Sequence, residues 1–225
     1  MTNKKISAIL IIFTIALFSI QNSYSTSFKL NIAGEKKFEV NYKVSQPQIL
    51  FLSKAPLEDI KGSVNSEFIS GLITLDPANI EETNGNITFE VKGMETGIQK
   101  RNGHLCSKDW LDAETYPKIT FNLQNMLGVK IEYSDVSKGR ATVSGTANGT
   151  ISIHGKSKTI NAEVTLTYIK ESEETKKRAP GDFLSVAGKF NVALEDFDIT
   201  GAQGIVGSKV GKVINIDFNL FFSSK

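Results

Sequence analysis

The sequence predicts an all-β fold made of many short antiparallel strands. Apolar and polar residues alternate along most of the chain, as in residues 38–44 (FEVNYKV), whose four apolar side chains share one face. A half-buried strand requires this period of two, because successive side chains point to opposite faces of a sheet. Turn-forming residues separate these runs, and one stretch around Trp110 loses the strand period. Together these observations indicate a β-sandwich or a closed β-barrel, and closure removes exposed strand edges.

The N-terminal residues have the pattern of a secretory signal peptide. A short basic region precedes residues 6–20, which are nearly all apolar, and residues 23–25 (SYS) place small side chains where a signal peptidase cleaves. An uncleaved anchor helix is the alternative, but an apolar run of roughly 15 residues is short for a membrane span of about 20. We expect residues 1–25 to be removed by cleavage near Ser25. Residues 26–225 then form a single domain without a membrane span, in a periplasmic or secreted protein.

The strand period gives the remaining elements in order. Proline lacks the N–H that a sheet ladder needs, so Pro77 ends one strand. Residues 80–86 are expected to be a polar turn region, residues 154–157 (HGKS) a hairpin turn, and residues 170–182 a charged hairpin loop with a solvated tip. The expected strands are residues 28–32, 38–44, 49–52, 62–64, 68–75, 87–91, 119–123, 138–150, 150–154, 158–169, 185–194 and 213–222.

Residues 100–121 are the exception to this period. The stretch contains the only tryptophan, the only cysteine and one of the two histidines. Ser107 is a favourable helix N-cap, and Asp109 lies in the first turn, where the helix dipole favours an acid. We therefore predict a short helix over residues 107–114, directly after the His-Leu pair at 104–105.

The mature chain carries almost no net charge. The full sequence has 26 Lys and Arg against 24 Asp and Glu, and two lysines are lost with the signal peptide. A balanced chain with interspersed charges gives no electrostatic footprint for nucleic acid. Since Cys106 has no second cysteine to pair with, the domain depends on its apolar core, which a chain of about 200 residues can supply.

No pattern in the sequence indicates an active site or a metal site. His104 and His154 do not stand at ligand spacing with carboxylates such as Asp109 or Asp112. An enzyme acting on a lipid or an oxidant through Cys106 or His104 is an alternative, but a lone cysteine is usually a small buried hydrophobe. We predict a protein that is not an enzyme, with no catalytic residue, no metal and no cofactor.

The apolar faces are more informative than the polar residues. Large side chains share one face of several strands, namely Phe89, Phe121, Phe190, Phe218 and Phe222. A small barrel either fills its interior with such side chains or leaves a cavity lined by them. A cavity would take an elongated apolar ligand, at about 25 cal/mol per Å² of buried apolar surface. Two hypotheses stay open here, a binding protein with a lined cavity and a structural or interaction barrel with a filled core.

Three ordered blocks of the sequence resemble the YceI-like family. The first comprises residues 94–97 (METG) and 100–121, with its KR, HL, DWLD and YP elements. The second is residues 149–158 (GTISIHGKSK), and the third is residues 188–197 (GKFNVALEDF) followed by 205–210. Together the resemblance covers about residues 62–220.

The resemblance implies a lipocalin-like extended antiparallel β-barrel, exported to the bacterial periplasm or beyond. It implies an interior channel that binds a polyisoprenoid or a similar long amphiphile, in a family of carriers or binders rather than enzymes. The expected partner is a long-chain isoprenoid, a quinone or a fatty-acid-like lipid. A second copy of the chain, in a homodimer, is a further candidate partner.

Candidate site residues combine the apolar faces with the matched motifs. Arg101, His104 and Asp109 match the polar positions of the first block, and with Trp110 they are candidates for the channel mouth or for structural polar positions. Trp110 and Leu111 are expected to pack the helix against the barrel. The candidate channel lining is Phe89, Val91, Phe121, Leu123, Ile151, Ile153, Phe190 and Phe218.

Overall fold

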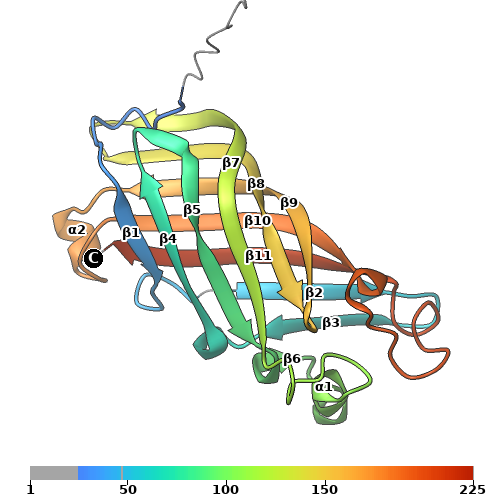
Figure 1. Ribbon diagram of the computed structural model, residues 1–225. Coiled ribbons are helices and arrows are strands. Elements are labelled where there is room, and N and C mark those ends of the chain that lie inside the picture. Colours follow the sequence, from blue (N-terminus) through green and yellow to red (C-terminus); the bar gives the residue numbers. More distant parts are fainter. Residues whose placement is uncertain (1–24, 47, 225) are drawn as a thin grey trace, which may run out of the picture.

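The computed structural model describes residues 25–46 and 48–224, and these form one antiparallel sheet that closes into a barrel (Figure 1). The predicted signal peptide lies almost entirely outside the described residues and stays a prediction. The strands are β1 (Lys36–Val40), β2 (Gln48–Lys54), β3 (Asp59–Val64), β4 (Ile69–Asp76), β5 (Asn79–Glu90), β6 (Met94–Glu95), β7 (Lys118–Asp135), β8 (Arg140–Ile153), β9 (Lys156–Ile169), β10 (Phe183–Ala193) and β11 (Val213–Ser224). The helical elements are α1 (Gln99–Cys106), α2 (Glu173–Lys176) and the short 3₁₀ turns η1 (Ser66–Phe68), η2 (Val91–Gly93) and η3 (Leu194–Phe197).

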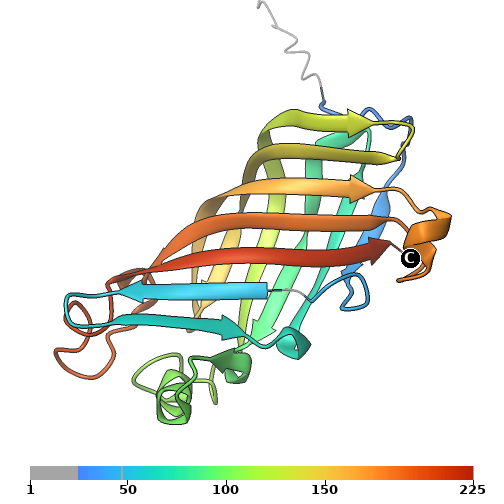
Figure 2. The same cartoon turned by 180° about the vertical axis from the view of Figure 1, so that it is seen from behind.

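Eight strands make the closed ring, in the order β1-β4-β5-β7-β8-β9-β10-β11, and β11 pairs back with β1. The predicted lipocalin-like, all-β barrel is therefore confirmed. The closing ladder is short, because only Phe38–Val40 of β1 pair with the C-terminal end of β11. The N-terminal half of β11 pairs instead with β2, which continues the sheet to β3 and β6 (Figure 2). The wall is thus extended by three strands at one end of the barrel.

The opposite end of the barrel is filled by side chains, and we call it the closed end. Its packing centres on five fully buried residues, Phe28, Phe38, Tyr168, Leu184 and Phe222. The rings of Phe28 and Phe38 lie 5.3 and 6.0 Å from the ring of Tyr168, centroid to centroid. Aromatic residues bury large apolar areas, so this cluster contributes strongly to the stability of a domain without disulfides.

Several sequence predictions of local structure are corrected. Residues 28–32 form no strand, because Phe28 and Leu30 are buried as part of the closed end while Lys29 and Asn31 adopt positive φ angles. β1 ends at Val40, and a turn follows in which the Val44 N–H donates to the Asn41 carbonyl. Residues 80–86 belong to β5 rather than to a turn, since residues 84–86 pair with β4 and residues 85–86 also with β7, while Ile80 and Thr83 are fully buried.

The predicted helix over residues 107–114 is also wrong. The helix α1 covers Gln99–Cys106 and so contains the His-Leu pair, while residues 107–116 form successive turns. Ser107 was expected to cap the start of a helix. It lies instead at the end of α1, where its backbone N–H and its hydroxyl both donate to the carbonyl of His104. The predicted contact is wrong as well as the predicted helix, because the Ser107 hydroxyl donates to a carbonyl at the C-terminal end of α1 instead of accepting from an N–H at a helix N-terminus.

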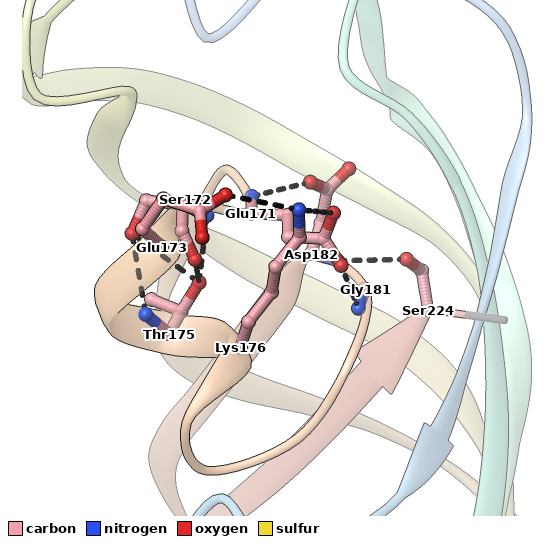
Figure 3. Close-up of polar contacts among 8 residues, drawn as sticks. All are labelled: Glu171, Ser172, Glu173, Thr175, Lys176, Gly181, Asp182 and Ser224. Atoms are coloured by element: carbon pink, nitrogen blue, oxygen red, sulfur yellow. Dashed lines mark hydrogen bonds and ion pairs between the residues drawn. The ribbon is translucent and has the colours of Figure 1, made fainter.

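The charged loop 170–182 has an ordered base at the closed end (Figure 3). The loop contains α2, where the Ser172 hydroxyl accepts from the Thr175 backbone in a capping box. The Asp182 carboxylate is buried, and it accepts from the Tyr168 hydroxyl at 2.5 Å and from the Glu171 N–H at 2.7 Å. Lys36 of β1 forms an ion pair with the same carboxylate at 2.8 Å.

Asp182 also joins this loop to the last strand. Its backbone N–H donates to the Ser224 hydroxyl and its carbonyl accepts from the Ser224 N–H. Burial opposes ionisation of Asp182, but the hydrogen bonds from Lys36 and Tyr168 outweigh burial and hold the pKa of the carboxyl below its usual range. The ionised carboxylate is therefore the stabilising form, and it links β1, β9 and the α2 loop, while the backbone of Asp182 makes the link to β11.

We predict that this network makes the closed end sensitive to acid. Because the pKa of Asp182 is lowered by folding, its contribution is complete above about pH 4, the unfolded value, and is lost as the pH falls through the folded pKa. The variant Asp182→Asn should lose about 2 kcal/mol of unfolding free energy at neutral pH. It should also show a flatter acid dependence, measured by urea unfolding from neutral pH downward.

Glu173→Gln is the matched control for this prediction. The Glu173 side chain lies in the same loop but is 90% exposed in its ion pair with Lys176, so its loss should leave both stability and acid dependence almost unchanged. An Asp182→Asn variant with the acid dependence of the unmodified protein would contradict the assignment.

Candidate functional site

The barrel encloses an apolar cavity of about 440 Å³. It extends from Leu220 and Phe222 at the closed end to Arg101, His104 and Trp110 at the end that carries α1. We call this second end the mouth. The interior is therefore not a solid core, and of the two hypotheses left open by the sequence the lined cavity matches the structure.

Strand alternation produces the apolar lining. In β11, Ile214, Ile216, Phe218, Leu220 and Phe222 point inward, while the intervening residues are mostly polar and face out. Residues that pair across neighbouring strands share the same face of the sheet. Phe218 pairs with Gly188 of β10 and with Ile49 of β2, so these positions also face inward. Inward positions from most strands of the barrel thus meet around one lumen.

Seven of the eight candidate lining residues border the cavity, namely Phe89, Phe121, Leu123, Ile151, Ile153, Phe190 and Phe218. Val91 does not lie among the lining residues. The strand period that suggested it stops at Glu90, because Val91 begins the 3₁₀ turn η2. Its side chain is buried in a cluster with Leu111 and Ile119, which do border the cavity, and its N–H donates to the Pro117 carbonyl. Val91 therefore packs against residues that line the cavity but does not itself border it.

The four polar and aromatic candidates, Arg101, His104, Asp109 and Trp110, all lie at the mouth. Arg101 of α1 forms an ion pair with Glu58, near the start of β3, with 2.5 Å between the guanidinium nitrogen and the carboxylate oxygen. Asn102 accepts from the N–H and the hydroxyl of Thr96, and its amide donates to Glu95 at 2.7 Å. These contacts fasten α1 beside β6 at the edge of the mouth (Figure 1).

Trp110 connects the turns after α1 to the loop between η3 and β11. Its ring lies against Gly201, where an added Cβ would stand 2.7 Å from the Trp110 Cη2 atom. Gly201 has a φ of +62°, a conformation that favours glycine. As expected, Trp110 and Leu111 pack their segment against the barrel. That segment consists of turns, however, and not of a helix.

Sequence reasoning missed two polar residues of the mouth. Glu58 and Lys209 also border the cavity, and they come from distant parts of the chain. The β2–β3 turn and the last loop are joined by the Leu57 N–H, which donates to the Ser208 carbonyl. No local pattern marks these residues, because only the extension of the sheet by β2 and β3 brings them to α1.

His154 and Cys106 are the remaining candidates for catalysis or metal binding, and the surroundings of both indicate a structural role. His154 has a positive φ at the β8–β9 turn, its ring contacts Tyr116 edge-on, and its Nδ1 atom lies 3.0 Å from the Phe197 carbonyl oxygen. Burial raises the pKa of the Cys106 thiol, which makes the thiolate scarcer and the residue less nucleophilic. Within residues 25–46 and 48–224, no three His, Cys, Asp or Glu side chains gather closely enough to hold a metal ion.

Comparison with known proteins gives one family. The model of the YceI-like domain matches residues 38–222. The UPF0312 protein of Vibrio campbellii is 26% identical over 160 residues, which cover 71% of each chain. The protein YceI of Salmonella newport is 23% identical over 207 residues, which cover 91% of this chain and 94% of the relative.

Three solved structures illustrate the similarity of fold. BcnA of Burkholderia cenocepacia aligns with a TM-score of 0.58 at 20% identity, covering 81% of this chain and 98% of BcnA. A polyisoprenoid binding domain from Saccharophagus degradans aligns with a TM-score of 0.55 at 14% identity, covering 85% of this chain and all of that domain. The YceI protein of Campylobacter jejuni aligns with a TM-score of 0.55 at 21% identity, covering 76% of this chain and 88% of the other. At these identities the likeness shows a shared fold.

The cavity predicts unequal costs for two phenylalanine truncations. Phe38→Ala empties a filled part of the closed end and should cost about 3–5 kcal/mol of unfolding free energy. Phe121→Ala enlarges a space that already exists and should cost about 1–2 kcal/mol, since fewer packing contacts are lost. Urea unfolding of both variants measures the difference. Equal losses would contradict the cavity at Phe121.

Proposed function

The chain belongs to the YceI-like family, and from this premise we propose that it is an exported protein that binds or carries a long-chain isoprenoid or another amphiphilic lipid. The observation that carries the proposal is the cavity, which is apolar along its length and polar at one end. The similar fold of the Saccharophagus degradans polyisoprenoid binding domain supports it.

The distribution of polar groups sets the orientation of such a ligand. Burying a polar group without a hydrogen-bond partner costs roughly 2–7 kcal/mol, whereas each buried methylene contributes about 0.8 kcal/mol. The apolar tail therefore lies toward Leu220 and Phe222. The polar head lies at the mouth, where Arg101, His104 and Lys209 border the cavity. This arrangement suits an amphiphile and leaves the chemical type of the head, such as a quinone ring or a carboxylate, to experiment.

The cavity volume sets the length of chain that the barrel encloses. A cavity of about 150 Å³ accommodates a benzene molecule, and the cavity here is about 440 Å³, close to three times larger. The enclosed part of a ligand is then about 18 carbon atoms, by proportion with benzene. The part of a longer tail beyond this length would extend out of the mouth into water, and burial would add no further binding free energy.

Export of the protein rests on the sequence. The basic start, the apolar run of residues 6–20 and the small residues before position 26 support cleavage near Ser25 and a periplasmic or secreted location. Across the part of the chain that the structure describes, no helix has the length and apolar character of a membrane span.

We predict that the purified protein takes up isoprenoid alcohols and that affinity rises with chain length only up to a limit. Binding should strengthen from geraniol through farnesol to geranylgeraniol, and then stay level for solanesol, because about 18 carbon atoms fill the cavity. Titration calorimetry measures the series, and mass spectrometry of an organic extract tests for co-purified lipid. If no lipid co-purifies and the protein takes up none of the alcohols, the proposal is overturned.

A variant that fills the lumen should abolish binding. Val164 of β9 points into the cavity, while its neighbour Thr165 is exposed on the outer face. Val164→Phe should reduce geranylgeraniol affinity by about tenfold or more while circular dichroism stays unchanged, since a benzyl group then occupies ligand space. Thr165→Phe adds the same ring outside the barrel and should bind as the unmodified protein does. Equal binding by both variants would place the ligand outside the lumen.

A further inference from the structure

Among the glycines at inward positions of the barrel wall, three stand beside phenylalanines. Gly62 of β3 stands opposite Phe51 of β2, and Gly188 of β10 stands opposite Phe218 of β11. Gly149 of β8 stands opposite Leu123, next to Phe121 on the same inward face of β7. Glycine inside a strand weakens it, because its backbone is flexible and no side chain packs. Three such positions in one wall therefore call for a structural reason.

In each case a phenylalanine ring takes the place of the missing side chain. An added Cβ at Gly62 would stand 2.1 Å from the Phe51 Cζ atom, and at Gly149 it would stand 2.5 Å from the Phe121 Cζ atom. At Gly188 it would stand 2.7 Å from the Phe218 Cζ atom. Atoms do not approach so closely, so each ring tip is in a recess of the wall that only glycine provides.

The same pair of strands shows what happens without the glycine. Four residues after Phe218, Phe222 stands opposite Leu184, and both side chains are fully buried at the closed end. There the ring meets a full side chain and fills the interior. At Phe218 the ring lies over Gly188 and borders an open lumen. The partner residue, rather than the phenylalanine, distinguishes the filled part of the barrel from the open part.

We propose that Gly62, Gly149 and Gly188 set the width of the lumen by receiving the rings of Phe51, Phe121 and Phe218, and that this width admits methyl-branched chains. The inference rests on the proposed function. An isoprenoid carries a methyl branch on every unit and is wider than a straight alkyl chain of the same backbone length. A ring displaced from its recess narrows the lumen at that level, and the branched chain is excluded before the straight one.

The test compares two alcohols with equal backbone length, geranylgeraniol and the unbranched hexadecanol. Gly188→Ala should lower the affinity for geranylgeraniol about tenfold or more and that for hexadecanol at most about threefold, measured by calorimetry. The double variant Gly188→Ala/Phe218→Leu shortens the displaced side chain and should restore geranylgeraniol binding. Gly145→Ala is the control, since the atoms nearest to an added Cβ at this inward glycine are the Met126 Cε atom and two backbone atoms, at 3.1 to 3.4 Å.

A second variant leaves the glycine in place. An added Cβ at Gly188 would also stand 2.6 Å from the Glu163 carbonyl oxygen, so Gly188→Ala disturbs the backbone as well as the ring. Phe218→Trp adds no Cβ at position 188, and the larger ring system exceeds the recess and must enter the lumen. It should produce the same preference for hexadecanol over geranylgeraniol. An unchanged preference in Phe218→Trp overturns the inference, because this variant adds no Cβ near the Glu163 carbonyl oxygen.

Crystal structures of the variants keep this inference separate from the proposed function. Gly188→Ala should show the Phe218 ring turned into the lumen and a smaller cavity, whether or not any lipid binds. If the unmodified protein binds neither alcohol, the proposed function fails, and the variant structures still decide what sets the width. A ring that stays in the wall of Gly188→Ala, with an unchanged cavity, overturns the inference alone.

Discussion

The double pairing of β11 is the constraint on which the rest of the structure depends. One end of this strand pairs with β1 and closes the ring, while the other end pairs with β2 and extends the wall. Backbone N–H and C=O groups require partners, and a strand of 12 residues has enough of them to bond different neighbours along its length. The end with β1 is narrow enough for side chains to fill. The end with β2, β3 and β6 is wider and needs α1 and its turns as a rim.

Much of the fold could be predicted because a half-buried strand leaves its period in the sequence. The limits of the prediction are also physical. The residues of α1 carry no N-cap signal, since Ile98 at its start makes no side-chain capping bond. The helix is held by contacts with distant residues, such as Arg101 with Glu58. Propensity within the segment could not reveal contacts of that kind, and it favoured residues 107–114 instead.

The cavity lining was accessible to the same reasoning only where the period persisted. Alternation along the strands correctly predicted that Phe121 and Phe218 line the cavity. The prediction for Val91 was wrong because the 3₁₀ turn η2 interrupts the alternation. Whether the interior is open could not be predicted from the apolar faces. That depends on which residue stands across from each ring, as the contrast between Phe218 with Gly188 and Phe222 with Leu184 illustrates. The register between neighbouring strands determines which residue stands across from each ring, and this register cannot be derived from a single sequence.

The filled closed end has a kinetic consequence. It is packed by Phe28, Phe38, Tyr168 and Phe222, so a ligand of the kind we propose would enter and leave through the mouth, at Arg101 and His104. An occupant cannot be pushed through from behind by a newcomer, so each exchange requires complete departure before the next arrival. The residence time of that ligand would then depend on contacts at the mouth, such as the ion pair between Arg101 and Glu58. If the protein carries a lipid as we propose, it would present the same end of the barrel to the donor and then to the acceptor.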